Sequence, residues 1–233
     1  MQRELVPISE AAQALDVDRS RVRSLIANGS LPAEKLAGRW FVGREGVLAR
    51  RREPVSAGRP LKARNAWAMM LAASGDEPPK EIDAMALWRM RRSLAYPGLA
   101  AMRPRLKGRA EPHAKWAPAG ELRALREDRR LVLSGSSAAG ALGLELVAPD
   151  AIDAYLPLEA LESVVREHGL QDAPSAQANV LLRAVPAEAW MLDGRKVAPR
   201  AAVALDLASY PDARSASAGM RLLAELEQGE RAA

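Results

Sequence analysis

Arginines and serines are closely spaced in one short segment of the sequence, RSRVRSLIANG. Arg19, Arg21 and Arg23 stand there at every second position. Ser20 lies between the first two arginines, and Ser24 directly follows the third. An arginine guanidinium can donate two hydrogen bonds to O6 and N7 of guanine in the major groove, and a serine hydroxyl can bond a base edge or a phosphate. On the outer face of one helix these residues would form a surface suited to duplex DNA. The alternative is an ordinary solvated helix face.

Two predicted helices would position this surface. In the second, the apolar Val22, Leu25 and Ile26 fall on one helical stripe, and Asn28-Gly29 is a natural end because glycine adopts the left-handed conformation easily. Asp18 can cap its start. The helix before it, ISEAAQAL, has Ser9 as its expected N-cap.

A small hairpin and a third helix are expected next. Leu36 and the run Trp40–Val42 flank Ala37-Gly38-Arg39, and a short helix follows from about Arg44 to Arg52. Helix, turn, helix, hairpin and helix make up the winged helix-turn-helix plan. The predicted DNA-binding residues are Arg19, Ser20, Arg21, Arg23, Ser24, Lys35, Arg39, Arg44, Arg50, Arg51, Arg52 and Arg59.

These residues divide into two predicted roles. We expect Arg19, Ser20 and Arg23 to contact bases, and Arg21 to contact a base or a phosphate. The hairpin cations Lys35 and Arg39 would reach the flanking backbone or the minor groove, and the later arginines would bind phosphates.

Residues 8–47 resemble the excisionase and MerR-type helix-turn-helix module. The matching residues are Ser9, Ala11, Ala12, Leu15, Val17, Ser20, Val22, Ile26, Gly29, Leu31, Pro32, Lys35, Gly38, Arg39, Trp40 and Glu45. The resemblance covers about a fifth of the chain. It implies a DNA-binding domain, which we place at residues 1–54.

Charge is divided unevenly along the 233 residues. Residues 1–130 carry 26 Lys and Arg against 15 Asp and Glu, a net +11, whereas residues 131–233 carry 8 against 14, a net −6. This charge distribution favours an N-terminal part that binds a polyanion, joined to a C-terminal part with another function. A GC-rich coding sequence would explain 28 Arg against 6 Lys, but it would not explain their segregation.

The composition excludes several classes of site. With no cysteine, the chain has no disulfide and no thiolate ligand, and its two histidines argue against histidine-based catalysis or a multi-histidine metal site. No apolar run approaches the roughly 18 residues of a membrane span, and the N-terminus lacks the apolar region of a secretory signal. We expect a cytoplasmic protein with no metal and no cofactor.

A basic linker and a helical segment are predicted in the middle of the chain. Residues 55–65 are rich in Arg, Pro, Gly and Ser, and Gly58-Arg59-Pro60 matches the core of an AT-hook without its flanking Pro-Arg, so a plain linker is favoured over a groove-reading hook. Residues 66–118 are expected to be helical, with Trp67, Trp88 and Trp116 in the core.

The back half, residues 119–233, mixes predicted strands (AIDAYLP, NVLLRAVP) with helices, which indicates an α+β fold. Its segment SGSSAAG meets no enzyme template. A nucleotide-binding P-loop needs Lys-Ser/Thr where Ala141-Leu142 stands, the carboxylates Asp150 and Asp153 are three residues apart rather than two, and no histidine base is suitably placed. We predict a structural corner between strand and helix, and no enzymatic activity.

The same back half resembles the C-terminal region of AbiEi-type antitoxins. The matching residues are Leu125, Asp128, Leu133, Ser134, Gly135, Ala138, Ala139, Ala204, Leu205, Asp206, Leu207, Asp212 and Arg214. The resemblance implies a bacterial transcriptional repressor that binds its own promoter and acts as the antitoxin of a type IV toxin-antitoxin pair, with a nucleotidyltransferase toxin as partner.

This chain departs from that family at its front, where the family has a plain winged helix. An excisionase-like or ligand-sensing regulator without a toxin therefore stays open as the alternative. A homo-oligomer is a further expected assembly.

Overall fold

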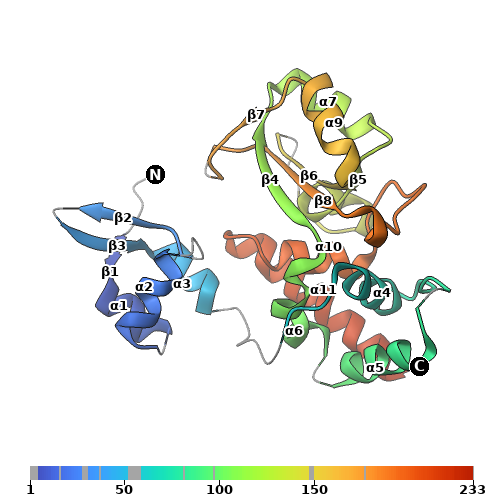
Figure 1. The fold of residues 1–233 in the computed structure, drawn as a ribbon, viewed down its shortest axis with the longest axis horizontal. Coiled ribbons are helices and arrows are strands. Elements are labelled where there is room, and N and C mark those ends of the chain that lie inside the picture. The colour runs from blue at the N-terminus through green and yellow to red at the C-terminus, as the bar shows by residue number, and fades with distance from the viewer. Residues whose placement is uncertain are drawn as a thin grey trace. The chain divides into compact units, whose positions relative to one another are not determined.

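The computed structural model describes residues 5–15, 17–27, 31–36, 38–51, 59–80, 82–96, 98–146, 150–175 and 177–232. The chain forms two compact units, residues 1–55 and 56–233 (Figure 1). Each unit combines helices with its own sheet, so the predicted mixed α+β class is confirmed. The predicted linker, residues 55–65, begins at the division between the units, and its last residues are helical.

The first unit packs three short helices against a three-stranded antiparallel sheet of order β1-β3-β2. Val6 pairs with Val42, and Lys35 pairs with Trp40. The elements in chain order are β1 (Leu5–Pro7), α1 (Ile8–Leu15), α2 (Arg19–Ala27), β2 (Ala33–Leu36), β3 (Arg39–Gly43) and α3 (Arg44–Arg51).

A small apolar core holds this unit together. It contains Val6, Ala11, Ala12, Val22, Leu25, Leu31, Val42 and Val47. The two predicted helices and the hairpin are present, but the three-residue β1 was not predicted because it is too short to show an alternating pattern. Helix α1 begins at Ile8, directly after β1, so the prediction of Ser9 as its N-cap is wrong. The predicted helix end at Asn28-Gly29 lies outside the described residues.

The second unit is built on a five-stranded sheet of order β5-β6-β8-β4-β7. The neighbouring inner strands β6 and β8 are parallel, and the other pairs are antiparallel. The strands are β4 (Glu111–Trp116), β5 (Val132–Leu133), β6 (Ile152–Pro157), β7 (Gln171–Asp172) and β8 (Val180–Val185).

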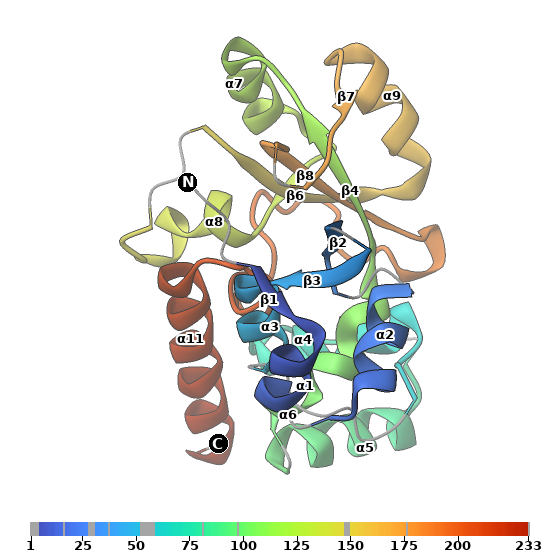
Figure 2. The same cartoon turned by 90° about the vertical axis from the view of Figure 1, so that its left-hand side faces the viewer.

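Helices lie on two sides of this sheet. In both views α7 and α9 lie at one end of the unit, and the other long helices form a layer at the opposite end (Figures 1 and 2). The α-helices are α4 (Ala63–Ala73), α5 (Ala84–Ala95), α6 (Leu99–Met102), α7 (Ala119–Glu127), α8 (Gly135–Ala138), α9 (Leu161–Glu167), α10 (Arg200–Leu207) and α11 (Ala213–Ala232). The 3₁₀ segments are η1 (Arg103–Arg109), η2 (Gly140–Leu142), η3 (Leu158–Ala160) and η4 (Ala187–Ala189).

The middle segment differs from its prediction. Residues 66–118 include the strand β4, which lies inside the sheet between β8 and β7 and joins this segment to residues 119–233 in one unit. Its sequence EPHAKW is too polar to indicate an inner strand.

The predicted burial of the three tryptophans is confirmed only in part. Trp67 is fully buried, packs edge-on against Tyr155 with ring centroids 4.8 Å apart, and donates from Nε1 to the carbonyl of Arg109 at 3.0 Å. Trp88 and Trp116 are exposed, so their predicted place in the core is wrong. Apolar neighbours at helical spacing do not by themselves determine which face of a helix is covered.

Candidate nucleic-acid interface

Helix α2 is fixed at both ends by hydrogen bonds and along one side by the core. The carboxylate of Asp18 accepts from the Ser20 hydroxyl at 2.5 Å and from the Arg21 backbone N–H at 2.8 Å, which confirms the predicted cap. These two bonds lower the pKa of Asp18. Beyond the helix, the N–H of Leu31 donates to the carbonyl of Leu25 at 3.0 Å. A short helix held in this way presents its outer face in a fixed orientation.

The outer face of α2 carries the predicted DNA-binding residues. All five of them (Arg19, Ser20, Arg21, Arg23 and Ser24) are exposed, whereas Val22 and Leu25 are buried. Successive residues advance by about 100° around a helix. Ser20, Arg23 and Ser24 therefore lie opposite the buried stripe, and Arg19 and Arg21 lie on its two flanks.

The two serine hydroxyls donate hydrogen bonds within the unit. Ser20 donates to Asp18, and Ser24 donates to the carbonyl of Ser20 at 3.1 Å. Each hydroxyl oxygen still has lone pairs that accept hydrogen bonds. In this arrangement both serines can receive a donor such as a base amino group.

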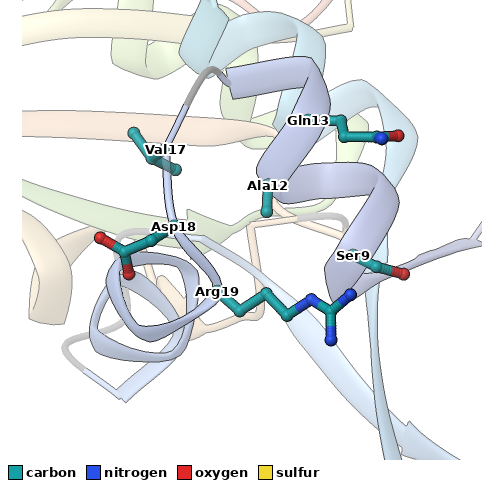
Figure 3. A pocket seen from close by; sticks show the side chains of 6 residues that line it. All are labelled: Ser9, Ala12, Gln13, Val17, Asp18 and Arg19. Carbon is teal, nitrogen blue, oxygen red and sulfur yellow. The ribbon is translucent and has the colours of Figure 1, made fainter.

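A depression lies between α1 and the start of α2. It is lined by Ser9, Ala12, Gln13, Val17, Asp18 and Arg19 (Figure 3). In this view the side chain of Arg19 extends toward Ser9. The guanidinium, the amide and the hydroxyl of this lining can donate hydrogen bonds to an oxyanion such as a phosphate, while the carboxylate of Asp18 on the same lining accepts from Ser20 and Arg21.

Ser9 and Gln13 were not among the predicted site residues. A signal for them exists in the sequence, because they are four residues apart on the side of α1 opposite its buried Ala11 and Ala12.

The hairpin separates its two predicted cations. Lys35 pairs with Trp40 and Leu36 pairs with Arg39, and neighbouring residues of a strand point to opposite faces. Lys35 and Arg39 are both exposed but lie on opposite faces of the hairpin. Gly38 forms the turn with a φ of 80°, and no atom lies within 4 Å of the position a Cβ would take.

The remaining predicted residues are spread along the chain. Arg44 is exposed at the start of α3, and Arg50 is partly buried near its end. The side chain of Arg51 and all of Arg52 lie outside the described residues. Arg59 belongs to the second unit, where it is exposed and its carbonyl accepts from Arg105 Nε at 3.2 Å.

In the second unit, the segment SGSSAAG begins at a buried network of charges. Ser134 donates to Asp206 at 2.5 Å, and Arg109 and Tyr155 also donate to that carboxylate. Beside it, Arg183 binds both oxygens of Asp153 at 2.9 Å. Asp153 and Asp206 are about 1% exposed, so this is a fully buried pair of carboxylates with two arginines.

The two carboxylates differ in their pKa. Burial raises the pKa of both, but in Asp206 the charges of Arg183 and Arg109 outweigh burial and hold the pKa below its usual value. For Asp153, the effect of burial on the pKa is larger than the opposite effect of the charge of Arg183. The negative charge of the neighbouring Asp206 raises the pKa further, so it lies above its usual value. Both carboxylates are paired with an arginine, Asp153 with Arg183 and Asp206 with Arg109.

A glycine is required in this segment because neighbouring atoms leave no room for a side chain. Gly135 has a φ of 47°, and a Cβ there would collide with the carboxylate of Asp153 and the hydroxyl of Tyr210. Tyr210 donates to that carboxylate at 2.6 Å. Among the described residues, no group of three or more His, Asp or Glu side chains is placed to hold a metal ion.

Residues shared with the AbiEi-type pattern lie mostly in the core of the second unit. Leu125, Leu133, Ser134, Ala138, Ala139, Leu205, Asp206 and Leu207 are buried. Asp128 and Asp212 stabilise local structure: Asp128 binds Arg130, and Asp212 accepts from the backbone of Ser215 near the start of α11. Most of the matching residues therefore contribute to how this unit packs.

Comparison with protein-family models, with curated proteins and with solved structures gives no match for this chain. No helix in the described ranges is long and apolar enough to cross a membrane.

Proposed function

We propose that the chain is a sequence-specific DNA-binding transcriptional regulator. In this proposal residues 1–54 form a winged helix-turn-helix domain, α2 is its recognition helix, and the β2–β3 hairpin is its wing. The observation that carries the proposal is the outer face of α2, where three arginines and two serines are exposed opposite a buried apolar stripe. A helix of this diameter fits the major groove.

We assign a different DNA contact to each of these side chains according to its position. Arg23, Ser20 and Ser24 lie at the centre of the outer face and are assigned to base edges. Arg19, which the sequence assigned to bases, lies on one flank and Arg21 on the other, and both are now assigned to the phosphates of the two strands. Ser9 and Gln13 assist Arg19. Lys35 and Arg39, on opposite faces of the wing, would each contact a different wall of the adjacent groove.

The second unit is assigned a regulatory role without catalysis. Its resemblance to AbiEi-type antitoxins supports a repressor that controls its own operon and counteracts a nucleotidyltransferase toxin. Co-expression tests this part: the gene downstream should be toxic alone and harmless in the presence of the full chain. If the downstream product is harmless alone or stays toxic with the full chain in excess, the antitoxin role is wrong while the regulator role stands.

The DNA-binding proposal is tested by Arg23→Ala in the full chain. Loss of a bidentate contact to guanine should weaken binding to the specific duplex by about 1–3 kcal/mol and relax base preference at one or two positions. The assay is fluorescence anisotropy with duplexes from the upstream region of the gene and with single-base variants of the bound site.

A matched control is Arg221→Ala, which removes the same charge from an exposed position on α11. It should leave both affinity and base preference unchanged. Equal effects of the two substitutions would contradict the assignment of α2 as the recognition helix.

A further inference from the structure

Helix α5 of the second unit exposes an unusual stripe of side chains. Met85 is 58% exposed, Trp88 is 54% exposed, and Tyr96, the residue after the helix, is 84% exposed. At about 100° per residue Met85 and Trp88 share one side of the helix with Arg89 and Arg92, and Tyr96 follows where the helix ends. The buried residues Met90 and Leu94 lie on the opposite side, toward the rest of the unit.

The position of α5 leaves this stripe uncovered by its own unit. The helix packs against α4, α6 and α11, and both views place it on the outside of the helical layer, away from the sheet (Figures 1 and 2). Exposed tryptophan and methionine cost free energy in water, at about 25 cal/mol per Å² of apolar surface. A group of them on one helix face is typical of an interaction surface.

The stripe is also strongly basic. Helix α5 contains Arg89, Arg91 and Arg92 and no acidic residue. In the described part of the chain no carboxylate forms an ion pair with any of the three. Arg92 lies over the ring of Trp88 at 5.4 Å, and Arg89 donates from Nε to the carbonyl of Met85 at 3.3 Å.

Composition favours a protein as the occupant. Tryptophan, tyrosine, methionine and arginine are the residues enriched at protein interfaces, and tryptophan, tyrosine and arginine contribute most to their binding energy. Nucleic acid fits less well, because residues 88 and 96 are about 12 Å apart along a helix, far more than the spacing of stacked bases. A symmetric dimer through this face would bring the arginines of both copies together.

We propose that the α5 stripe (Met85, Trp88, Arg89, Arg92 and Tyr96) binds an amphipathic helix of another protein. The partner helix is apolar on its contact face and carries glutamate or aspartate along the borders. Its apolar side chains cover Met85 and Trp88, as ridges of one helix fit the grooves of another. Its carboxylates pair with the arginines, which gives the interface its specificity.

A synthetic helical peptide of this chemistry provides the test. The probe has leucines at helical spacing with glutamates on both borders, and the control peptide has lysines in place of the glutamates. Binding of each labelled peptide to the full chain is measured by anisotropy. We expect the acidic peptide to bind and the lysine peptide to bind at least about tenfold more weakly.

Two variants locate the site on the chain. Arg92→Glu should weaken acidic-peptide binding by about tenfold or more, and Trp88→Ala should do the same. Arg221→Glu, which changes the charge equally on α11, should alter it less than about twofold. Circular dichroism confirms that each variant is folded.

Three results would overturn the proposal: no preference for the acidic peptide, equal effects of Arg92→Glu and Arg221→Glu, or no loss of peptide binding with Trp88→Ala. Binding of a labelled single-stranded oligonucleotide to the full chain is measured as a further comparison. If it binds and Trp88→Ala abolishes its binding while the acidic peptide does not bind, the stripe is a nucleic-acid platform instead. The result for Arg23→Ala on duplex DNA is independent of all these outcomes.

Discussion

Replacing Asp206 by asparagine should strongly destabilise the second unit. The carboxylate is about 1% exposed and accepts hydrogen bonds from Ser134, Tyr155 and Arg109, and Arg183 lies 3.4 Å away. Asparagine removes the charge and leaves the buried guanidinium of Arg109 without its counterion. Removing one partner of a buried ion pair typically costs about 3–5 kcal/mol. This is a large part of the roughly 5–15 kcal/mol that stabilises a typical domain.

The neighbouring carboxylate gives an internal comparison. The pKa of Asp206 is lowered and that of Asp153 is raised, so the folded unit favours the charge on Asp206 more than the charge on Asp153. With asparagine at 153, Arg183 keeps the carboxylate of Asp206 as a counterion 3.4 Å away, and the amide oxygen can still accept from Arg183 or Tyr210. Asp153→Asn should therefore cost about 1–2 kcal/mol, less than Asp206→Asn. Asp150→Asn, at an exposed position, should change stability by no more than about 0.5 kcal/mol.

Urea unfolding of the full chain, followed by tryptophan fluorescence, measures these differences. Trp67 is buried against Tyr155 in the same core, so its emission reports the loss of this packing. A cost of less than about 1 kcal/mol for Asp206→Asn, or a larger cost for Asp153→Asn than for Asp206→Asn, would refute this role of the buried carboxylates.

Two further predictions concern the second unit. Burial raises the pKa of Asp128, but hydrogen bonds from Arg130 and His168 outweigh it and lower the pKa from 3.8 to about 2. Its ionised form therefore stabilises the fold above about pH 4, and this contribution is lost as the pH falls through about 2; urea titrations in this range should show a flatter decline for Asp128→Asn. Gly135→Ala should destabilise the unit by about 1–3 kcal/mol because of its positive φ and the collision with Asp153. Gly143→Ala, where φ is 70° and the space around the Cβ is open, should cost less, and thermal denaturation of the two variants measures the difference.

Local sequence patterns were sufficient for much of the fold. The apolar stripe of Val22 and Leu25, the Asp18 cap and the turn at Gly38 predict α2 and the hairpin, because each depends on residues close in sequence. The segments AIDAYLP and NVLLRAVP, each mostly apolar with one charged residue, predict the strands β6 and β8. The polar strand β4 was not, because its place in the sheet depends on partners about 60–70 residues further along the chain.

The buried network could not be predicted for the same reason. Its charges come from η1, β6, β8 and α10, and nothing in the sequence near Arg109 or Asp206 indicates that they meet. For the site, the sequence identified the basic residues of α2 but not Ser9 and Gln13. Those two residues are candidates because they line the depression between α1 and α2.

The central claim is that the first unit binds duplex DNA specifically through cations that neutralise phosphates. Its most direct test is the affinity of the full chain for a duplex from its own upstream region, measured across salt concentrations. About six phosphate contacts predict a log–log slope near −5, so binding should weaken by about 10³-fold between 50 and 200 mM salt. A scrambled duplex should bind much more weakly at every concentration. A flat salt response, or equal affinity for the scrambled duplex, would contradict the account.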